Sequence, residues 1–461
     1  MNYIIKGTSI VNESNISYGD ILIKDGRIEK IASNIDTKYK TTDINAEGLH
    51  LLPGAIDDQV HFREPGLTHK ANIYTESRAA VAGGVTSFME MPNTNPPAFT
   101  QELLEEKYTI ASKTSLANYS FFMGTSNDNY DEVMRTNEKK KDVCGVKIFM
   151  GSSTGNLLVD NPLTLDKIFA GTELLIATHC EEESMIKANM EKLLSQKKIL
   201  APSDHPVIRN EDVCFESSFK AIQLAKKNNT RLHILHISTA KELQLFTNLI
   251  PLKDKRITAE VCVHHLHFTA DDYATLGDRI KCNPAIKAPH NKAALWEALL
   301  DDRLDIIATD HAPHTLEEKG FVRNADGSIT PPANGEGHKG GAHAGLPLVQ
   351  HPLLLMLYYV KQGRISIEKV AEKMCHAPAT CFQLKERGFI REGYFADLVL
   401  VDLNKQHTVS KDNIYYKCGW SPLEGFTFPA TIEKTFVNGN IVYGNNGFDE
   451  SVRGMRLQFE R

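Results

Sequence analysis

Apolar and polar positions follow one pattern at the two ends of the chain and another in the middle. Residues 1–52 contain short strand-like apolar runs, with turns expected at 17–20 and at the hairpin pair Asp25-Gly26. From Gly54 onward, apolar runs of strand length alternate with amphipathic segments of helical period. Strand patterns return after about residue 388, at 395–402 and at 432–442 around the pair Asn438-Gly439. The pattern predicts a small β segment at each end and a βα region between them.

The central region contains eight apolar runs of strand length. They cover residues 55–62, 85–91, 117–123, 143–150, 174–178, 232–237, 257–263 and 304–309. Amphipathic segments lie between them, among them 72–82, 102–112, 215–227, 241–252 and 291–300. Eight parallel strands with intervening helices form a (β/α)8 barrel of the TIM type. We therefore predict an α/β fold in which residues 53–387 form the barrel, while 1–52 and 388–461 together form a small composite β-sandwich domain.

Composition and charge indicate which kind of partner the protein binds. A chain of 461 residues with a net charge of -6 offers no basic surface for nucleic acid or for an anionic membrane, and no apolar run approaches membrane-spanning length. The first residues lack the basic and apolar regions of a leader peptide. Eight dispersed cysteines without a C-x-x-C pair indicate free thiols. We expect a cytoplasmic protein that acts on a small molecule.

The first apolar run ends in a stretch with candidate chemistry. A period of two residues places Gln59, His61 and Arg63 on one face, and Glu64-Pro65-Gly66 then ends the strand. A histidine can bind a divalent metal, and an arginine can orient an anionic substrate beside it. The alternative is a strand whose polar face only meets water.

Lys147 is an isolated amine within the apolar run 143–150. Because an unpaired buried ammonium is unfavourable, we expect this group to be neutral, paired or chemically modified. Carboxylation by carbon dioxide would make it an anion that can bridge two metals. The alternative is a lysine that extends to the barrel mouth.

Histidines follow two further strands. His179 and His236 offer neutral imidazoles suited to zinc, although buried histidines are also common in protein cores. Barrel strands bring side chains that are far apart in sequence to one mouth, so we expect both to lie near His61. His233 is expected to face the other way and to be structural.

Asp310 follows the eighth run and is suited to act both as a metal ligand and as a proton acceptor; alternatively, it only caps a helix. His264, His265 and His267 form the densest histidine group, but neighbouring positions should not share one face, so most are expected to be structural or to support ligands.

The polar stretch 335–345 is expected to form a mobile loop near the mouth.

Several motifs together resemble the dihydroorotases of the amidohydrolase superfamily. In the family's order they are Pro53-Gly54-Ala55-Ile56-Asp57, His61-Phe62-Arg63-Glu64-Pro65-Gly66, Met91-Pro92-Asn93-Thr94, Gly145-Val146-Lys147, His179, His236-Ile237-Ser238-Thr239, Asn283-Pro284 and Thr309-Asp310-His311-Ala312-Pro313-His314. The ordered set is far more specific than any single piece. The resemblance implies zinc-dependent, reversible cyclisation of N-carbamoyl-L-aspartate to L-dihydroorotate, a step of pyrimidine (UMP) biosynthesis.

The resemblance also implies a metal centre with one or two zinc ions. His179 and His236 would hold one ion, Lys147 carboxylated by carbon dioxide would bridge, and His61 with Asp310 would hold the second. Asp310 would be the catalytic residue that transfers the proton.

The family's substrate contacts fall on four further positions. Arg63 and Asn93 would grip the substrate carboxylate, while Asn283 and His314 would complete its contacts. By analogy with the family, we expect a homo-oligomer, most simply a dimer.

Gln59 departs from the family pattern, which usually has a histidine two residues before His61. A glutamine offers only a neutral amide oxygen, a weaker zinc ligand than imidazole. Three outcomes are open: a binuclear enzyme with one weakened site, a mononuclear enzyme that uses Lys147, His179 and His236, or a catalytically inactive scaffold. The presence of the other ligands favours an active enzyme. The nearest catalytic rival is a hydantoinase or allantoinase, which would share the metal ligands but act on a different ring.

Overall fold

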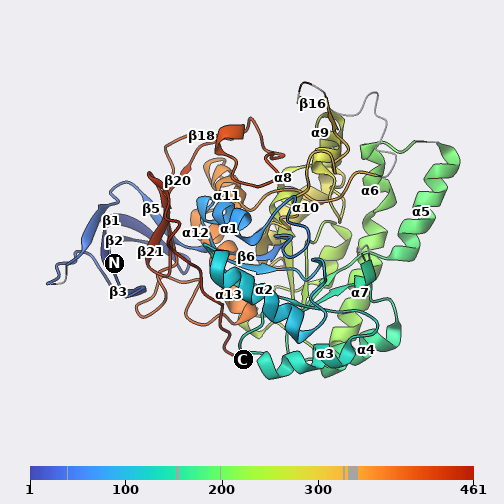
Figure 1. Cartoon of the computed structure of the whole chain (residues 1–461), viewed down its shortest axis with the longest axis horizontal. Coiled ribbons are helices and arrows are strands. Elements are labelled where there is room, and N and C mark those ends of the chain that lie inside the picture. The colour runs from blue at the N-terminus through green and yellow to red at the C-terminus, as the bar shows by residue number, and fades with distance from the viewer. Residues whose placement is uncertain (39, 152–154, 198, 325, 327, 331–340) are drawn as a thin grey trace.

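The central region of the chain folds into a barrel of parallel strands and surrounding helices (Figure 1). The computed structural model describes residues 1–461 except 39, 152–154, 198, 325, 327 and 331–340. The barrel strands are β6 (Ala55–Val60), β7 (Val85–Glu90), β8 (Asn118–Phe121), β9 (Met123–Gly124), β10 (Val146–Phe149), β11 (Ile176–His179), β12 (Leu232–Ile234), β13 (Ile257–Cys262) and β14 (Ile306–Ala308). All eight predicted runs therefore form strands, and the third is divided into β8 and β9.

The first and last strands of the barrel lie side by side. Val60 forms a parallel bridge with His311, and the His61 amide donates to the His311 carbonyl at 2.7 Å. The Thr309 hydroxyl adds a hydrogen bond of 2.6 Å to the Asp57 carboxylate. These contacts bring the segments that follow β6 and β14 to the same end of the barrel.

Helices cover the outside of the barrel and join its strands. They are α1 (Ile73–Ala82), α2 (Gln101–Thr114), α3 (Tyr130–Arg135), α4 (Pro162–Gly171), α5 (Glu183–Gln196), α6 (His205–Ile208), α7 (Glu211–Asn228), α8 (Val263–His267), α9 (Tyr273–Leu276), α10 (Pro289–Leu300), α11 (Pro352–Lys361), α12 (Ile367–Ala371) and α13 (Ala377–Phe382). The residues before two helices fix where those helices begin. The Asn72 side chain caps α1 by accepting a hydrogen bond from the Thr75 amide, and the Thr100 side chain caps α2 by accepting one from the Leu103 amide. Four of the five amphipathic segments named from the sequence are thus confirmed as helices.

The predicted amphipathic helix at 241–252 is wrong. Only a short 3-10 turn forms at Lys241–Leu245. Leu249, which a helix would have to bury on its apolar face, is 88% exposed, and Pro251 cannot supply a helical amide donor. Leu243 and Phe246 are buried, but Leu249 and Ile250 beyond them are exposed, so no surface supports a longer helix there.

Strands from both ends of the chain pair in one nine-stranded sheet, as expected for an element built from both termini, although the sandwich itself stays a prediction. It contains β1 (Tyr3–Asn12), β2 (Asn15–Lys24), β3 (Arg27–Ala32), β4 (Thr42–Asn45), β5 (His50–Pro53), β17 (Leu398–Asp402), β20 (Thr431–Val437), β21 (Asn440–Gly444) and β22 (Gly447–Phe448). β5 pairs with β17, so the blue N-terminal and red C-terminal strands lie together beside the barrel in Figure 1. Two short hairpins lie outside it: β15 (Val322–Arg323) with β16 (Ile329–Thr330), and β18 (His407–Thr408) with β19 (Thr427–Phe428). The exact boundaries at 52/53 and 387/388 stay predictions.

The turns of this sheet agree with the sequence at two places and differ at one. Asp25-Gly26 and Asn438-Gly439 adopt positive φ between paired strands, as expected. The turn expected at 17–20 is wrong, because these residues lie inside β2. Gly19 has another purpose there: a Cβ would approach the carbonyl oxygen of Ala32 on β3 to 2.5 Å.

A buried polar network joins this sheet to the barrel. Arg387 forms an ion pair with Asp397, both side chains being 3% exposed, and also donates to Asn438. Asn118 on barrel strand β8 donates to Asp397 at 3.1 Å and accepts from Asn438 at 2.8 Å. Each side chain therefore satisfies its neighbours within a region from which water is excluded.

Replacing Arg387 by methionine is expected to lower the free energy of unfolding by about 3–5 kcal/mol, because Asp397 is left buried and unpaired. Urea unfolding followed by circular dichroism measures this. The matched control is Arg27→Met, which breaks an exposed pair with Glu386 and should cost about 1 kcal/mol or less. Equal losses in the two variants would contradict the role assigned to the buried network.

Candidate active site

The structure brings all ten site residues named from the sequence to one cavity of about 170 Å³. The cavity lies where the barrel strands end, as chemistry does in such barrels. Its lining includes Gln59, His61, Arg63, Asn93, Lys147, His179, His236, Asn283, Asp310 and His314. These positions are contributed by segments spread over about 250 residues of sequence, so only the fold makes them neighbours.

His61 and Asp310 form one side of the cavity. His61 Nε2 lies 3.1 Å from Asp310 Oδ1, and its Nδ1 lies 2.7 Å from the side-chain oxygen of Asn93. An amide oxygen can only accept, so Asn93 fixes the ring proton on Nδ1 and leaves a lone pair on Nε2. A lone pair and a carboxylate at this distance are suited to share a cation.

His179 and His236 form a second pair in the lining. His179 Nδ1 lies 3.0 Å from His236 Nε2, while its Nε2 donates to Glu181 at 3.0 Å. Arg209 also pairs with Glu181, and although burial alone would raise the pKa of this carboxyl, the cation and the histidine lower it to about 2. A carboxylate that holds the outer N–H of a histidine is a common support for a metal-binding imidazole.

His236 adds a second sign of a ligand site. Its Nδ1 is buried and has no hydrogen-bond partner among the described residues. Burial and the neighbouring His179 hold the pKa of His236 well below its ordinary value, so the ring is neutral. Neutral imidazoles are the form that binds zinc.

Lys147 lies on β10 with only 1% of its surface exposed. Burial lowers the pKa of this lysine to about 7, so a large fraction is the neutral amine at neutral pH. Its Nζ lies 4.5 Å from the centre of the Phe149 ring, and no hydrogen-bond acceptor reaches it within the part of the chain that the structure describes. A neutral, unpaired amine beside two histidines and an aspartate fits carboxylation and metal bridging.

Gln59 contacts Asp310 and Cys262. Its amide nitrogen donates to Asp310 at 3.3 Å, and its oxygen lies 3.8 Å from the Cys262 sulfur. The oxygen, the weak ligand expected from the sequence, thus faces Cys262 in this conformation, and the nitrogen faces the carboxylate.

Arg63 supplies the cation of the cavity. Its Nη2 contacts His314 Nε2 at 3.1 Å, and its Nε donates to the Pro313 carbonyl at 3.2 Å. Burial lowers the pKa of Arg63 to about 10, which keeps it charged at neutral pH. His314 is held in turn by Lys70 and Glu318, so the guanidinium is fixed in place.

The backbone is unusual at three of these positions. Arg63, His236 and Asp310 have φ values of 68°, 42° and 48°, in the left-handed region that side chains other than glycine seldom adopt. Such strain is found mainly where surrounding structure holds a residue for function. With this backbone conformation, all three residues line the cavity.

Sequence reasoning missed several residues at the site. Phe149 and Ala312 also line the cavity. Residues 343–345 of the loop expected near the mouth line it too, whereas 335–340 of that loop lie outside the described residues. Gly345 approaches the Ala312 carbonyl so closely that a Cβ would lie 2.4 Å away. Glu181 could have been found, since a period of two residues places it on the same face as His179.

A buried carboxylate pair flanks His233, which lies outside the lining of the cavity. His233 Nε2 lies 3.3 Å from Asp58 and 3.1 Å from Glu260, and all three are fully buried. Glu260 also accepts from the backbone amide of His236 at 3.0 Å. This group therefore positions the segment that carries His236.

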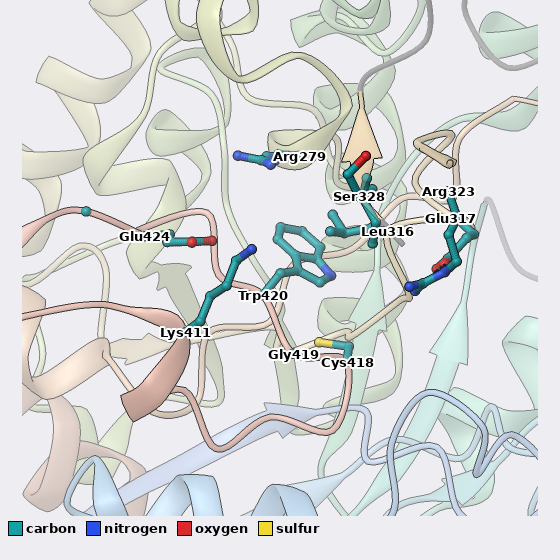
Figure 2. Close-up of a pocket in the computed structure, with 12 residues that line it drawn as sticks. Arg279, Leu316, Glu317, Arg323, Ser328, Lys411, Cys418, Gly419, Trp420 and Glu424 are labelled. Carbon is teal, nitrogen blue, oxygen red and sulfur yellow. Dashed lines mark hydrogen bonds and ion pairs between the residues drawn. The ribbon is translucent and has the colours of Figure 1, made fainter. Parts of the chain in front are cut away.

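A larger cavity of about 710 Å³ lies behind His314. Figure 2 shows the Trp420 indole at its centre, between Lys411 with Glu424 on one side and Arg323 with Glu317 on the other. Trp420 Nε1 donates to the His314 carbonyl at 2.7 Å. Trp420 thus steadies a residue of the candidate active site while its ring lines the second cavity.

Comparison with known proteins identifies the family. A model of the amidohydrolase family matches residues 50–442. The chain belongs to this family. The amidohydrolase is 31% identical to the dihydroorotase of Pyrococcus abyssi over 99% of this chain and 98% of the relative. It is 28% identical to the allantoinase of Deinococcus radiodurans over 99% of both chains.

A solved structure supports the fold. The L-hydantoinase (dihydropyrimidinase) from Arthrobacter aurescens shares a TM-score of 0.87 with this amidohydrolase over 97% of each chain, at 24% identity. The family and the relatives make this protein a hydrolase of cyclic amide C–N bonds that acts on small molecules. Within the described residues, no helix is long and apolar enough to cross a membrane.

Proposed function

We propose that this amidohydrolase is a zinc-dependent dihydroorotase that reversibly cyclises N-carbamoyl-L-aspartate to L-dihydroorotate in pyrimidine biosynthesis. One observation carries the choice of substrate: the buried guanidinium of Arg63 lies in the same cavity as the histidine, lysine and aspartate groups. A planar, permanently charged fork matches a carboxylate, which L-dihydroorotate carries and hydantoin lacks. The dihydroorotases among the relatives support the same choice.

The donor groups fit one or two zinc ions. His179, His236 and carboxylated Lys147 would hold one ion, and His61 with Asp310 would complete a second site with Lys147 as the bridge. When bound, zinc supplies Lewis acidity, which polarises the ring carbonyl and activates water. We further propose a cytoplasmic homodimer, on the analogy stated above.

The protein's own groups position the substrate and move the proton. Arg63 and Asn93 bind the carboxylate, so that the scissile amide lies toward Asp310. In ring opening the Asp310 carboxylate accepts a proton and returns it to the leaving nitrogen; in ring closure the order is reversed. Asn283 and His314 orient the remaining polar atoms of the ring.

Substrate comparison tests the proposal. The purified chain, supplied with zinc and bicarbonate, is assayed for ring opening of L-dihydroorotate, hydantoin and allantoin. We expect kcat/KM to be highest for L-dihydroorotate. Preference for allantoin would assign the protein to the activity of its Deinococcus relative instead, and no turnover on any of the three would favour the inactive scaffold.

Replacing Gln59 by histidine is expected to tighten binding of the metal at His61 and Asp310 about tenfold, because an imidazole is a better zinc ligand than an amide. Competition with a chelator measures the affinity. The matched control is Gln59→Leu, which removes the amide without adding a ligand and should not tighten binding. If the histidine and leucine variants bind equally, residue 59 does not reach the metal.

A further inference from the structure

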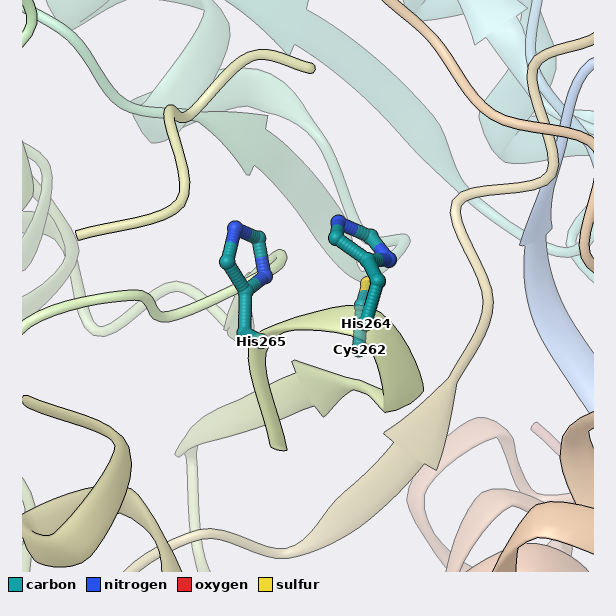
Figure 3. Close-up of side chains that lie close together, drawn as sticks. All are labelled: Cys262, His264 and His265. Atoms are coloured by element: carbon teal, nitrogen blue, oxygen red, sulfur yellow. The ribbon is translucent and has the colours of Figure 1, made fainter. Parts of the chain in front are cut away.

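Cys262, His264 and His265 form a second group of potential metal ligands, outside the lining of the candidate active site. Their donor atoms all lie within 4.8 Å of one another. All three side chains are buried, with exposed fractions of 0%, 1% and 3%. Figure 3 shows the two imidazole rings side by side on the short helix α8, with the Cys262 sulfur close to His264.

The hydrogen bonding of His265 leaves a donor atom unused. Its Nε2 lies 3.1 Å from the Pro284 carbonyl oxygen, which can only accept, so Nε2 carries the proton. Nδ1 then bears a lone pair, and this buried atom has no hydrogen-bond partner among the described residues. A histidine whose outer N–H is held by a backbone carbonyl is prepared for metal binding through its other nitrogen.

His264 is more unusual, because both of its ring nitrogens are buried and neither makes a hydrogen bond of good geometry with a described residue; the Thr309 backbone only approaches the ring. Its ring centre lies 4.1 Å from that of His265. Leaving polar atoms buried without partners is unfavourable, and native structures seldom do so without a reason such as an ion. Three such atoms on two adjacent side chains point to a ligand that is bound there.

The chemistry of these donors identifies the ligand. One thiol and two neutral imidazoles are the borderline-soft donors that zinc prefers, whereas magnesium and calcium take oxygen ligands. In a tetrahedral zinc site the donor atoms lie about 3.4–3.6 Å apart, so small side-chain rotations would close the present spacing. On binding, the Cys262 thiol would release its proton to solvent and act as a thiolate.

Gln59 supplies the fourth position. Its amide oxygen lies 3.8 Å from the Cys262 sulfur, and its amide nitrogen donates to Asp310. Once the thiol has lost its proton it no longer donates to Gln59, and the amide oxygen is available to a cation. Zinc with one thiolate leaves a net positive charge at the site. The Glu260 carboxylate, 4.0 Å from the same sulfur, offsets part of this positive charge.

We propose that Cys262, His264 and His265, with Gln59 as the fourth ligand, form a zinc site separate from the Lys147 centre. This proposal does not rest on the proposed substrate. It also gives Gln59 a purpose of its own, since one side chain would contact both the new site and Asp310.

Cobalt(II) gives a direct test, since a thiolate ligand produces charge-transfer absorption in the near ultraviolet. The Lys147 centre consists of nitrogen and oxygen ligands and cannot produce it. Full-length protein is freed of metal with a chelator, checked by circular dichroism, and titrated with cobalt(II) chloride alone. We expect wild-type protein to develop the absorption and Cys262→Ser to lack it and to hold one ion fewer per chain.

Cys180→Ser is the matched control. Cys180 is also buried and lies next to His179, and its sulfur contacts only the Thr178 hydroxyl at 3.3 Å among the hydrogen bonds described. This variant should keep both the absorption and the ion. His265→Leu serves as a second probe should Cys262→Ser fold poorly, because leucine fills the space without offering a ligand atom.

The outcomes are distinct from those of the substrate assay. Absorption that persists in Cys262→Ser, that is lost in Cys180→Ser, or that is absent from wild-type protein would overturn the proposal. Absorption lost only in Cys262→Ser and His265→Leu would establish the site even if L-dihydroorotate were not a substrate.

Discussion

Lys147→Ala is expected to lose the zinc of the Lys147 centre and ring-opening activity together, with kcat/KM falling at least about 1,000-fold, or about 4 kcal/mol of transition-state stabilisation. The amine lies on β10 in the cavity shared with His179 and His236, and a carboxylated amine there would lie in the same cavity as the Asp310 carboxylate. Metal analysis and the L-dihydroorotate assay measure the two losses on the same preparation.

Lys373→Met is the matched control. Lys373 is also almost completely buried, but its Nζ donates to the Leu304 carbonyl at 2.7 Å and pairs with Asp302, away from the cavity. This variant should lose stability while it keeps zinc and turnover. Full zinc occupancy in Lys147→Ala would contradict the bridging role.

Short carboxylic acids provide an independent check on the Lys147 substitution. If the modified lysine contributes a carboxylate, then formate or propionate bound in the space left by Lys147→Ala should restore part of both zinc binding and turnover. The same acids should have no effect on wild-type protein. Restoration by neutral formamide to the same extent would show that the added molecule only fills space.

Arg63→Met is expected to lower kcat/KM for L-dihydroorotate about 100- to 1,000-fold, or about 3–4 kcal/mol, because a buried, charge-assisted contact to the substrate is lost. Residual turnover of hydantoin, which has no carboxylate, should change much less. Steady-state kinetics on both substrates measure the difference.

Arg63→Lys separates charge from geometry. A lysine keeps the positive charge but cannot present two parallel donors, so an intermediate loss is expected. Equal loss on L-dihydroorotate and hydantoin would mean that Arg63 mainly holds Pro313 and His314 in place.

The sequence was sufficient for features that depend on neighbouring residues. Strand runs, helix caps such as Asn72 and the Asp25-Gly26 turn follow from local patterns of apolarity, hydrogen bonding and backbone freedom. Segment 241–252 and Gly19 show where this fails. A helical period forms a helix only if another surface covers it, and a glycine can serve a close approach between strands instead of a turn.

The sequence by itself determined which side chains were available to the site: a lysine in an apolar strand, an arginine beside a histidine, and polar residues where strands end. Only the tertiary structure decided how they meet. It placed His179 against His236, turned the Gln59 oxygen toward Cys262, and put the rings of His264 and His265 4.1 Å apart. Such distances depend on how separate strands pack around one axis, and spacing along the chain carries no record of that packing.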